Sequence, residues 1–180
     1  MDPRPDGLIV ASPCNPAGTM LAPEELAAIA RWCHANGVRL ISDEIYHGLH
    51  YGARGVSALE VSDDVYVINS LSKYFSMTGW RVGYCVAPPL LTRELRKVHQ
   101  FNTFSIAHPL QQAIAQYLVE TPQSWQQLAQ FFQAKRDRLR SALAGSDWLA
   151  PAAQGTYFQL IDYSALSDAG DVEFADRVLT

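Results

Sequence analysis

The chain has 180 residues, of which 48% are hydrophobic and 18% are charged, and its formal net charge is −4. These values are typical of an ordinary globular protein with one domain, or with one domain and part of a second, because domains commonly contain about 100–150 residues. The slightly acidic balance offers no basic surface for nucleic acid or for acidic lipid, so we set both classes of partner aside.

The sequence gives no sign of a membrane segment or of a secretory leader. No apolar run approaches the roughly 20 residues that a membrane-spanning helix needs. The first seven residues are polar and rich in proline, whereas a leader is charged and then apolar. We therefore expect a cytoplasmic protein.

Cysteine and histidine are too sparse to suggest a disulfide framework or a metal site. The three cysteines, Cys14, Cys33 and Cys85, are an odd number without close pairing, which predicts reduced thiols. His47 and His50 have no neighbouring cysteine pair and no helical partner four residues away. We expect polar loop histidines and no metal.

The first elements form a strand, a helix and a second strand. An apolar run at residues 8–11 ends in Ser12-Pro13 and predicts a buried strand. Pro23 occupies a first helical position, and the helix that it begins should stop at Asn36-Gly37. A further strand follows at residues 38–41. Such a unit with short connections is a right-handed crossover, which predicts a parallel sheet.

The rest of the chain predicts an α/β fold whose mostly parallel sheet is sandwiched by helices. Residues 65–68 and 82–86 are short, nearly continuous apolar runs, as expected for strands covered on both faces. The pattern then predicts helices at 90–101, 109–119, 122–143 and 172–179, and a strand at 155–163. We place a change of domain near Thr121-Pro122, with a smaller α+β domain beginning after it.

Polar residues gather at one edge of the predicted sheet. In an open parallel sheet, ligands bind at the carboxyl ends of the strands. The residues at those ends are Asn15 after the first strand, 43–46 after the second and 70–73 after the third, and Arg81 stands just before the fourth. We expect the functional site at this edge.

The third of these segments carries a candidate nucleophile. An amine such as that of Lys73 attacks carbonyl compounds when its pKa falls below the ordinary value of about 10.4. Arg81 offers a fixed positive fork that suits a phosphate group, and Ser70 and Ser72 add hydroxyl donors. The segment therefore offers an amine nucleophile, hydroxyl donors and a cationic group that suits a phosphate.

Two acidic residues stand side by side at the end of the second strand. In an extended chain the side chains of Asp43 and Glu44 point to opposite faces, so only one of them can enter the crevice. A carboxylate in that position can pair with a protonated ring nitrogen.

Four segments together resemble the class I/II aminotransferases of the aspartate aminotransferase fold, which use pyridoxal 5'-phosphate. The segments are Asn15-Pro16-Ala17-Gly18-Thr19, Ser42-Asp43-Glu44-Ile45-Tyr46, Ser70-Leu71-Ser72-Lys73 and Thr78-Gly79-Trp80-Arg81-Val82-Gly83-Tyr84. From about residue 84 to 171 the chain is most similar to bacterial methionine and kynurenine-type aminotransferases. Residues 155–158 resemble the start of that family's small-domain sheet.

The resemblance implies a fold and a domain division. The fold would be that of the type I pyridoxal-phosphate transferases. Residues 1–121 would be the rear part of the large cofactor-binding domain, and 122–180 an interdomain helix with the start of the small C-terminal domain. A chain truncated at both ends is implied, because the family's glycine-rich phosphate turn would precede Met1 and its substrate-carboxylate arginine would follow Thr180.

The resemblance also implies a reaction and a role for each matching residue. The reaction is amino transfer between an amino acid and a 2-oxo acid, in a homodimer. Catalytic roles would belong to Lys73, which forms a Schiff base with the cofactor, to Asp43, which keeps the pyridine nitrogen protonated, and to Tyr46. Asn15 and Tyr46 would hydrogen-bond the phenolic oxygen of the ring, and Ser70, Ser72 and Arg81 would hold the phosphate.

Three alternatives stay open. The same residues serve carbon–sulfur lyases of this fold, and a catalytically incomplete fragment would also keep them. Ser70-x-x-Lys73 fits the nucleophile motif of serine β-lactamases and penicillin-binding proteins, although the Ser-Asp-Asn and Lys-Thr-Gly elements of those enzymes are absent from the sequence.

Overall fold

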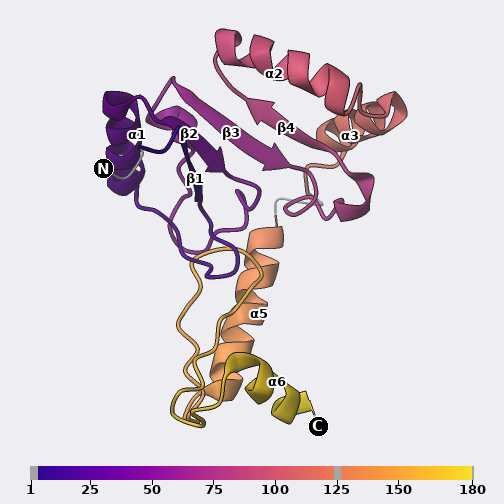
Figure 1. Cartoon of the computed structure of the whole chain (residues 1–180). Helices are drawn as coiled ribbons and strands as arrows, with labels where there is room; N and C mark the ends of the chain where they lie inside the picture. The colour runs from indigo at the N-terminus through magenta and orange to yellow at the C-terminus, as the bar shows by residue number, and fades with distance from the viewer. Residues whose placement is uncertain (1–3, 124–126, 180) are drawn as a thin grey trace.

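The computed structural model describes residues 4–123 and 127–179. In this part of the chain a sheet of four strands has the spatial order β1-β2-β3-β4 (Figure 1). The strands are β1 (Gly7–Ala11), β2 (Arg39–Asp43), β3 (Val65–Ser70) and β4 (Gly83–Val86). All four predicted strands of the sheet are confirmed, and neighbours in the sequence are also neighbours in the sheet.

The sheet is mostly parallel, as predicted, but its last strand runs the other way. β1 pairs with β2 and β2 with β3 in parallel, whereas β4 is antiparallel to β3, with Ser70 opposite Gly83. The start of β4 therefore lies at the edge where β3 ends. This orientation explains how a residue just before β4 can belong to the same edge as residues after β1, β2 and β3.

The helix α1 (Pro23–Asn36) covers one face of the sheet. It begins with Pro23, and Gly37 ends it in the left-handed conformation with φ of 66°. Its buried residues Leu26, Ala30 and Cys33 recur at helical spacing and pack with Leu40 of β2 and Val65 of β3, among others. This contact forms the main hydrophobic core.

Leu26→Ala is expected to destabilise this core. The Leu26 side chain is only 2% exposed, so its removal leaves a cavity between α1 and the sheet. Such substitutions cost about 2–5 kcal/mol in the free energy of unfolding. Chemical denaturation would measure the loss, and Leu59→Ala, at a position that is 43% exposed, serves as the control. Equal stability of the two variants would contradict the packing described.

Two helices follow the sheet, α2 (Pro89–Asn102) and α3 (His108–Glu120), in agreement with the predicted ranges. α2 lies alongside β4 (Figure 1). Ile114 of α3 packs with Leu71 and Met77 in a second hydrophobic cluster. α3 therefore packs against the loop that follows β3.

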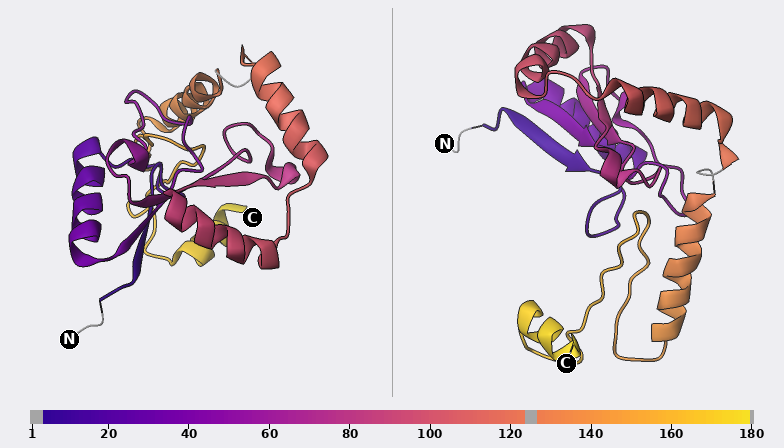
Figure 2. Two further views of the ribbon diagram at one scale, coloured as in Figure 1. Left: turned by 90° about the horizontal axis from the view of Figure 1, so that it is seen from above. Right: turned by 90° about the vertical axis from the view of Figure 1, so that its right-hand side faces the viewer.

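The helix α5 (Leu128–Leu143) extends away from the sheet, and α6 (Asp171–Leu179) lies at its far end (Figures 1 and 2). The helix predicted from Pro122 begins later, because Pro122 stands in a turn, and residues 124–126 lie outside the described residues. Within the described ranges, no helix combines the length and apolar character that crossing a bilayer demands.

The strand predicted at 155–163 is wrong. This segment forms only the isolated bridges of Gly155 with His50 and of Asp162 with Leu149. Thr156 has a φ of 65°, which interrupts an extended chain, and its amide donates to the carbonyl of Leu49 at 2.8 Å. The segment thus returns from α5 to the loops that follow β1 and β2 and bonds to them instead of to a neighbouring strand.

Two glycines make this return possible. Gly18 accepts at its carbonyl from the amides of Gln154 and Gly155, at 2.7 and 3.0 Å. A Cβ on Gly18, whose φ is 68°, would lie 2.7 Å from the Cβ of Ala153, and a Cβ on Gly155 would lie 2.7 Å from the Cβ of Pro13. At both positions the two chain segments lie so close together that an added Cβ atom would clash, so glycine is required.

Candidate functional site

A cavity of about 290 Å³ opens at the edge of the sheet where β1 and β2 end. Its lining residues are Ala11, Pro13, Asn15, Asp43, Ile45, Tyr46 and Lys73. The structure therefore brings together Asn15, Asp43, Tyr46 and Lys73, which the sequence assigned to one site from three separate segments. They supply an amide, a carboxylate, a phenol and an amine.

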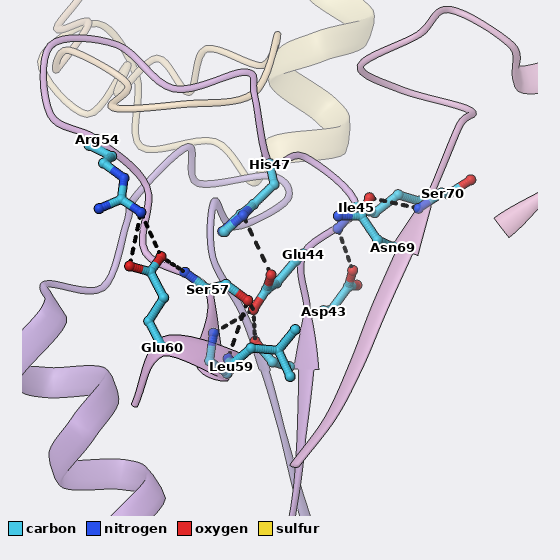
Figure 3. A network of polar contacts seen from close by, with 12 residues as sticks. Asp43, Glu44, Ile45, His47, Arg54, Ser57, Leu59, Glu60, Asn69 and Ser70 are labelled. Atoms are coloured by element: carbon cyan, nitrogen blue, oxygen red, sulfur yellow. Dashed lines mark hydrogen bonds and ion pairs between the residues drawn. The ribbon is translucent and has the colours of Figure 1, made fainter. Parts of the chain in front are cut away.

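Asp43 is the last residue of β2, and its carboxylate belongs to the cavity. Its Oδ1 accepts a hydrogen bond of 3.1 Å from the amide of Ile45, which fixes the side chain over the turn that follows (Figure 3). Glu44 points away from the cavity and is bonded to Ser42 and to Ser57. The prediction that only one of the two acidic side chains can enter the crevice is confirmed.

Tyr46 is buried and stays a neutral phenol. Burial raises its pKa above the ordinary value, the neighbouring Tyr157 and the charge of Asp43 raise it further, and a hydrogen bond with Asn15 acts in the opposite direction. The raised pKa favours the protonated hydroxyl, which can donate a hydrogen bond.

Two aromatic residues of the returning segment contact Tyr46, and sequence reasoning missed both contacts. The ring of Tyr46 meets those of Tyr157 and Phe158 edge to face, with centroids 5.5 and 5.9 Å apart. The sequence predicted a strand here, and residues 155–158 resemble the start of the family's small-domain sheet, but neither indication pointed to a contact with Tyr46. No local pattern signals a contact between residues more than one hundred positions apart.

Lys73 lies in the loop between β3 and the 3-10 turn η2 (Thr78–Trp80). The loop is held by Thr78, whose Oγ1 donates to the carbonyl of Ser72 at 2.8 Å, and by the amide of Met77, which donates to the carbonyl of Leu71 at 3.2 Å. Together with the packing of α3, these contacts give Lys73 a defined backbone on which its amine reaches the cavity.

The three residues assigned to a phosphate do not line this cavity. Ser70 Oγ lies 2.9 Å from Ser72 Oγ and 3.1 Å from the carbonyl of Val82. Ser70 instead lines a second cavity, of about 620 Å³, between β3, β4 and α2. Arg81 is exposed in the left-handed conformation and donates from Nη1 to the carbonyl of Thr78 at 3.1 Å. A phosphate role for these residues stays a prediction.

Cysteine and histidine have structural roles around the site. Cys33 is buried in the main core, and Cys14, Cys33 and Cys85 are free thiols in the structure. His47 Nδ1 lies 3.4 Å from Glu44 Oε2. Among residues 4–123 and 127–179 no cluster of three or more histidine, cysteine or acidic side chains could hold a metal ion.

Comparisons with known proteins agree on one family. The family model described as "Aminotransferase class I and II" matches residues 1–180. A methionine aminotransferase of Escherichia coli is 37% identical over 171 residues, which are 93% of this chain and 44% of that protein. A valine–pyruvate aminotransferase of Mycobacterium tuberculosis is 48% identical over 126 residues, 69% of this chain and 32% of that protein.

Solved structures give the same result for the fold. A crystal structure of an Escherichia coli protein identified as a methionine aminotransferase superposes with a TM-score of 0.88 at 38% identity, over 93% of this chain and 45% of the other. A double mutant of the aspartate aminotransferase of Thermus thermophilus reaches a TM-score of 0.89 at 30% identity, over 99% and 48%. The chain thus spans less than half the length of each of these proteins.

Proposed function

Because the chain belongs to the class I and II aminotransferase family, we propose that it serves pyridoxal-phosphate-dependent transfer of an amino group between an amino acid and a 2-oxo acid. The observation that carries the proposal is the cavity in which Lys73 and Asp43 lie together with Tyr46 and Asn15. This set of groups matches what the cofactor needs around its ring.

The chemistry of the four side chains suits pyridoxal phosphate group by group. A primary amine, Lys73, would hold the aldehyde carbon as a Schiff base. A carboxylate, Asp43, would pair with the protonated pyridine nitrogen. The phenol of Tyr46 and the amide of Asn15, which line the same cavity, would bind the phenolic oxygen of the ring. When bound, the cofactor supplies an electron sink for negative charge on the substrate's α-carbon.

The residues of the chain would position groups and move one proton. The freed amine of Lys73 would take the proton from the substrate's α-carbon and deliver it to the C4' carbon of the cofactor, which requires a neutral Nζ at working pH. Asp43 would keep positive charge on the ring nitrogen during this transfer. Ser70, Ser72 and Arg81 would bind the phosphate, with the arginine fork replacing its present bond to Thr78.

The alternatives have less support. The relatives described above are all aminotransferases, which favours amino transfer over carbon–sulfur lysis. The Ser-Asp-Asn and Lys-Thr-Gly elements that the acyl enzymes need are absent from the sequence, which disfavours that alternative. A homodimer and a cytoplasmic location belong to the same proposal and rest on the family alone.

The test is an amino-transfer assay on the purified chain with pyridoxal phosphate, a ¹⁵N-labelled amino acid and a 2-oxo acid. We expect the label to appear in a new amino acid, detected by mass spectrometry. Bound cofactor without labelled product would identify an incomplete fragment, and release of ammonia and a thiol would identify a lyase. Labelling of Ser70 by penicillin would favour the acyl enzyme.

A further inference from the structure

Glu44 is a buried acidic residue that the proposed reaction does not use. Its side chain is 3% exposed. Its Oε1 accepts three hydrogen bonds, from Ser42 Oγ at 3.0 Å, from Ser57 Oγ at 3.1 Å and from the amide of Ala58 at 2.7 Å. This carboxylate and its three donors form what we term the Glu44 anchor.

The anchor joins two segments that are separate in the sequence. Ser57 and Ala58 follow Glu44 by 13 and 14 residues and begin the 3-10 turn η1 (Ala58–Glu60). Burial of a carboxylate costs several kcal/mol unless hydrogen bonds compensate for the lost water, and here three donors meet one oxygen. The side chain of Glu44 therefore joins the two ends of the loop that residues 44–58 form.

The main chain of Glu44 is fixed as well. Its amide donates to the carbonyl of Ile68 at 2.8 Å and ties this residue to β3. Its carbonyl accepts from the amide of His47 at 2.8 Å, which closes the turn that contains Tyr46. With the side chain and both peptide groups held, residue 44 has little freedom to rotate.

Residues on both sides of this fixed residue line the cavity. Asp43 precedes it and lies on the opposite face of the chain, and Tyr46 follows two positions later. Since adjacent side chains of an extended segment point in opposite directions, holding Glu44 on one face sets the direction of Asp43 on the other. We propose that Glu44 is a positioning residue, whose anchor orients Asp43 and Tyr46 toward the ring of the bound cofactor.

This inference rests on the proposed function for the identity of the ring, but the anchor can also be tested without the cofactor. The amide of Ile45 donates to Asp43 Oδ1 at 3.1 Å, so its hydrogen exchange reports where the Asp43 carboxylate lies. The amide of Ala30, in the middle of α1, reports global unfolding instead. A purely structural role would change both exchange rates together.

The experiment compares Glu44→Ala with Glu44→Gln, which keeps an acceptor oxygen. Glu60→Gln is the control, because Glu60 is an exposed acid of the same turn that does not bond to Glu44, and a glutamine keeps an oxygen that can accept from Arg54 and from the amide of Ser57. We expect Glu44→Ala to speed exchange at Ile45 but not at Ala30, and to weaken pyridoxal phosphate binding about tenfold, as the loss of such bonds implies. Glu44→Gln should stay within about threefold of the wild type, and Glu60→Gln should match it.

Unchanged exchange at Ile45 in Glu44→Ala, or equal acceleration at Ala30, would overturn the inference. If Glu44→Ala does not fold, Ser57→Ala removes one donor from the half-buried edge of the anchor and should give the same pattern at smaller amplitude. If the wild-type chain binds no pyridoxal phosphate, the proposed function fails, and selective exchange at Ile45 still decides whether the anchor positions Asp43.

Discussion

Replacing Lys73 with alanine is expected to abolish covalent attachment of pyridoxal phosphate to the chain. Lys73 is the lysine whose side chain lines the cavity with Asp43 and Tyr46, and an alanine offers no amine to the aldehyde. Borohydride reduction of the wild-type complex, followed by peptide mapping, should place the adduct on residue 73. The variant should also lose at least about a thousandfold in amino transfer, because general-base catalysis alone contributes 10²–10⁴-fold.

The matched control for this change is Lys97→Ala. Lys97 is an exposed lysine of α2 that pairs with Glu94 at 2.7 Å and does not line the cavity of Lys73. Exposed lysines can react with aldehydes without specificity, so the control separates such labelling from attachment at the site. A reducible adduct that persists at an equivalent site in Lys73→Ala would show that the assignment is wrong.

Asp43→Asn is expected to separate cofactor binding from reaction. An asparagine has nearly the same shape, but it carries no charge to favour a protonated pyridine nitrogen, and an unprotonated ring is a weaker electron sink. We expect pyridoxal phosphate to bind still, while the rate of amino transfer falls by about 10²–10⁴-fold. Cofactor titration by absorbance and the labelled-nitrogen assay would measure the two quantities separately.

Asp64→Asn is the control, because it removes the same charge at a position outside the site. Asp64 precedes β3 and pairs with Arg39, at the opposite end of the strands from the cavity. It should leave both the affinity and the rate unchanged. A wild-type rate in Asp43→Asn would mean that another group charges the ring, or that the ring does not lie against β2.

Local patterns determined the elements and the chemical character of the site. The limits of α1 follow from Pro23 and Gly37, and the strand, helix and strand of the first third predicted parallel pairing of β1 with β2. The identities of Asn15, Asp43, Tyr46 and Lys73 indicated the site because the carboxyl ends of parallel strands meet at one edge. These conclusions depend on residues close to one another in the chain, where dihedral preferences and spacing act directly.

The features that depend on the paths of the long loops were decided only by the tertiary structure. In the structure β4 is antiparallel to β3. Residues 155–163 bond to the first two loops and do not form the predicted strand, and Tyr157 contacts Tyr46. It also gave Glu44 its partners in η1 and left Ser70 outside the cavity of Lys73. Such contacts join residues that no periodicity relates, because their meeting depends on how the whole chain packs.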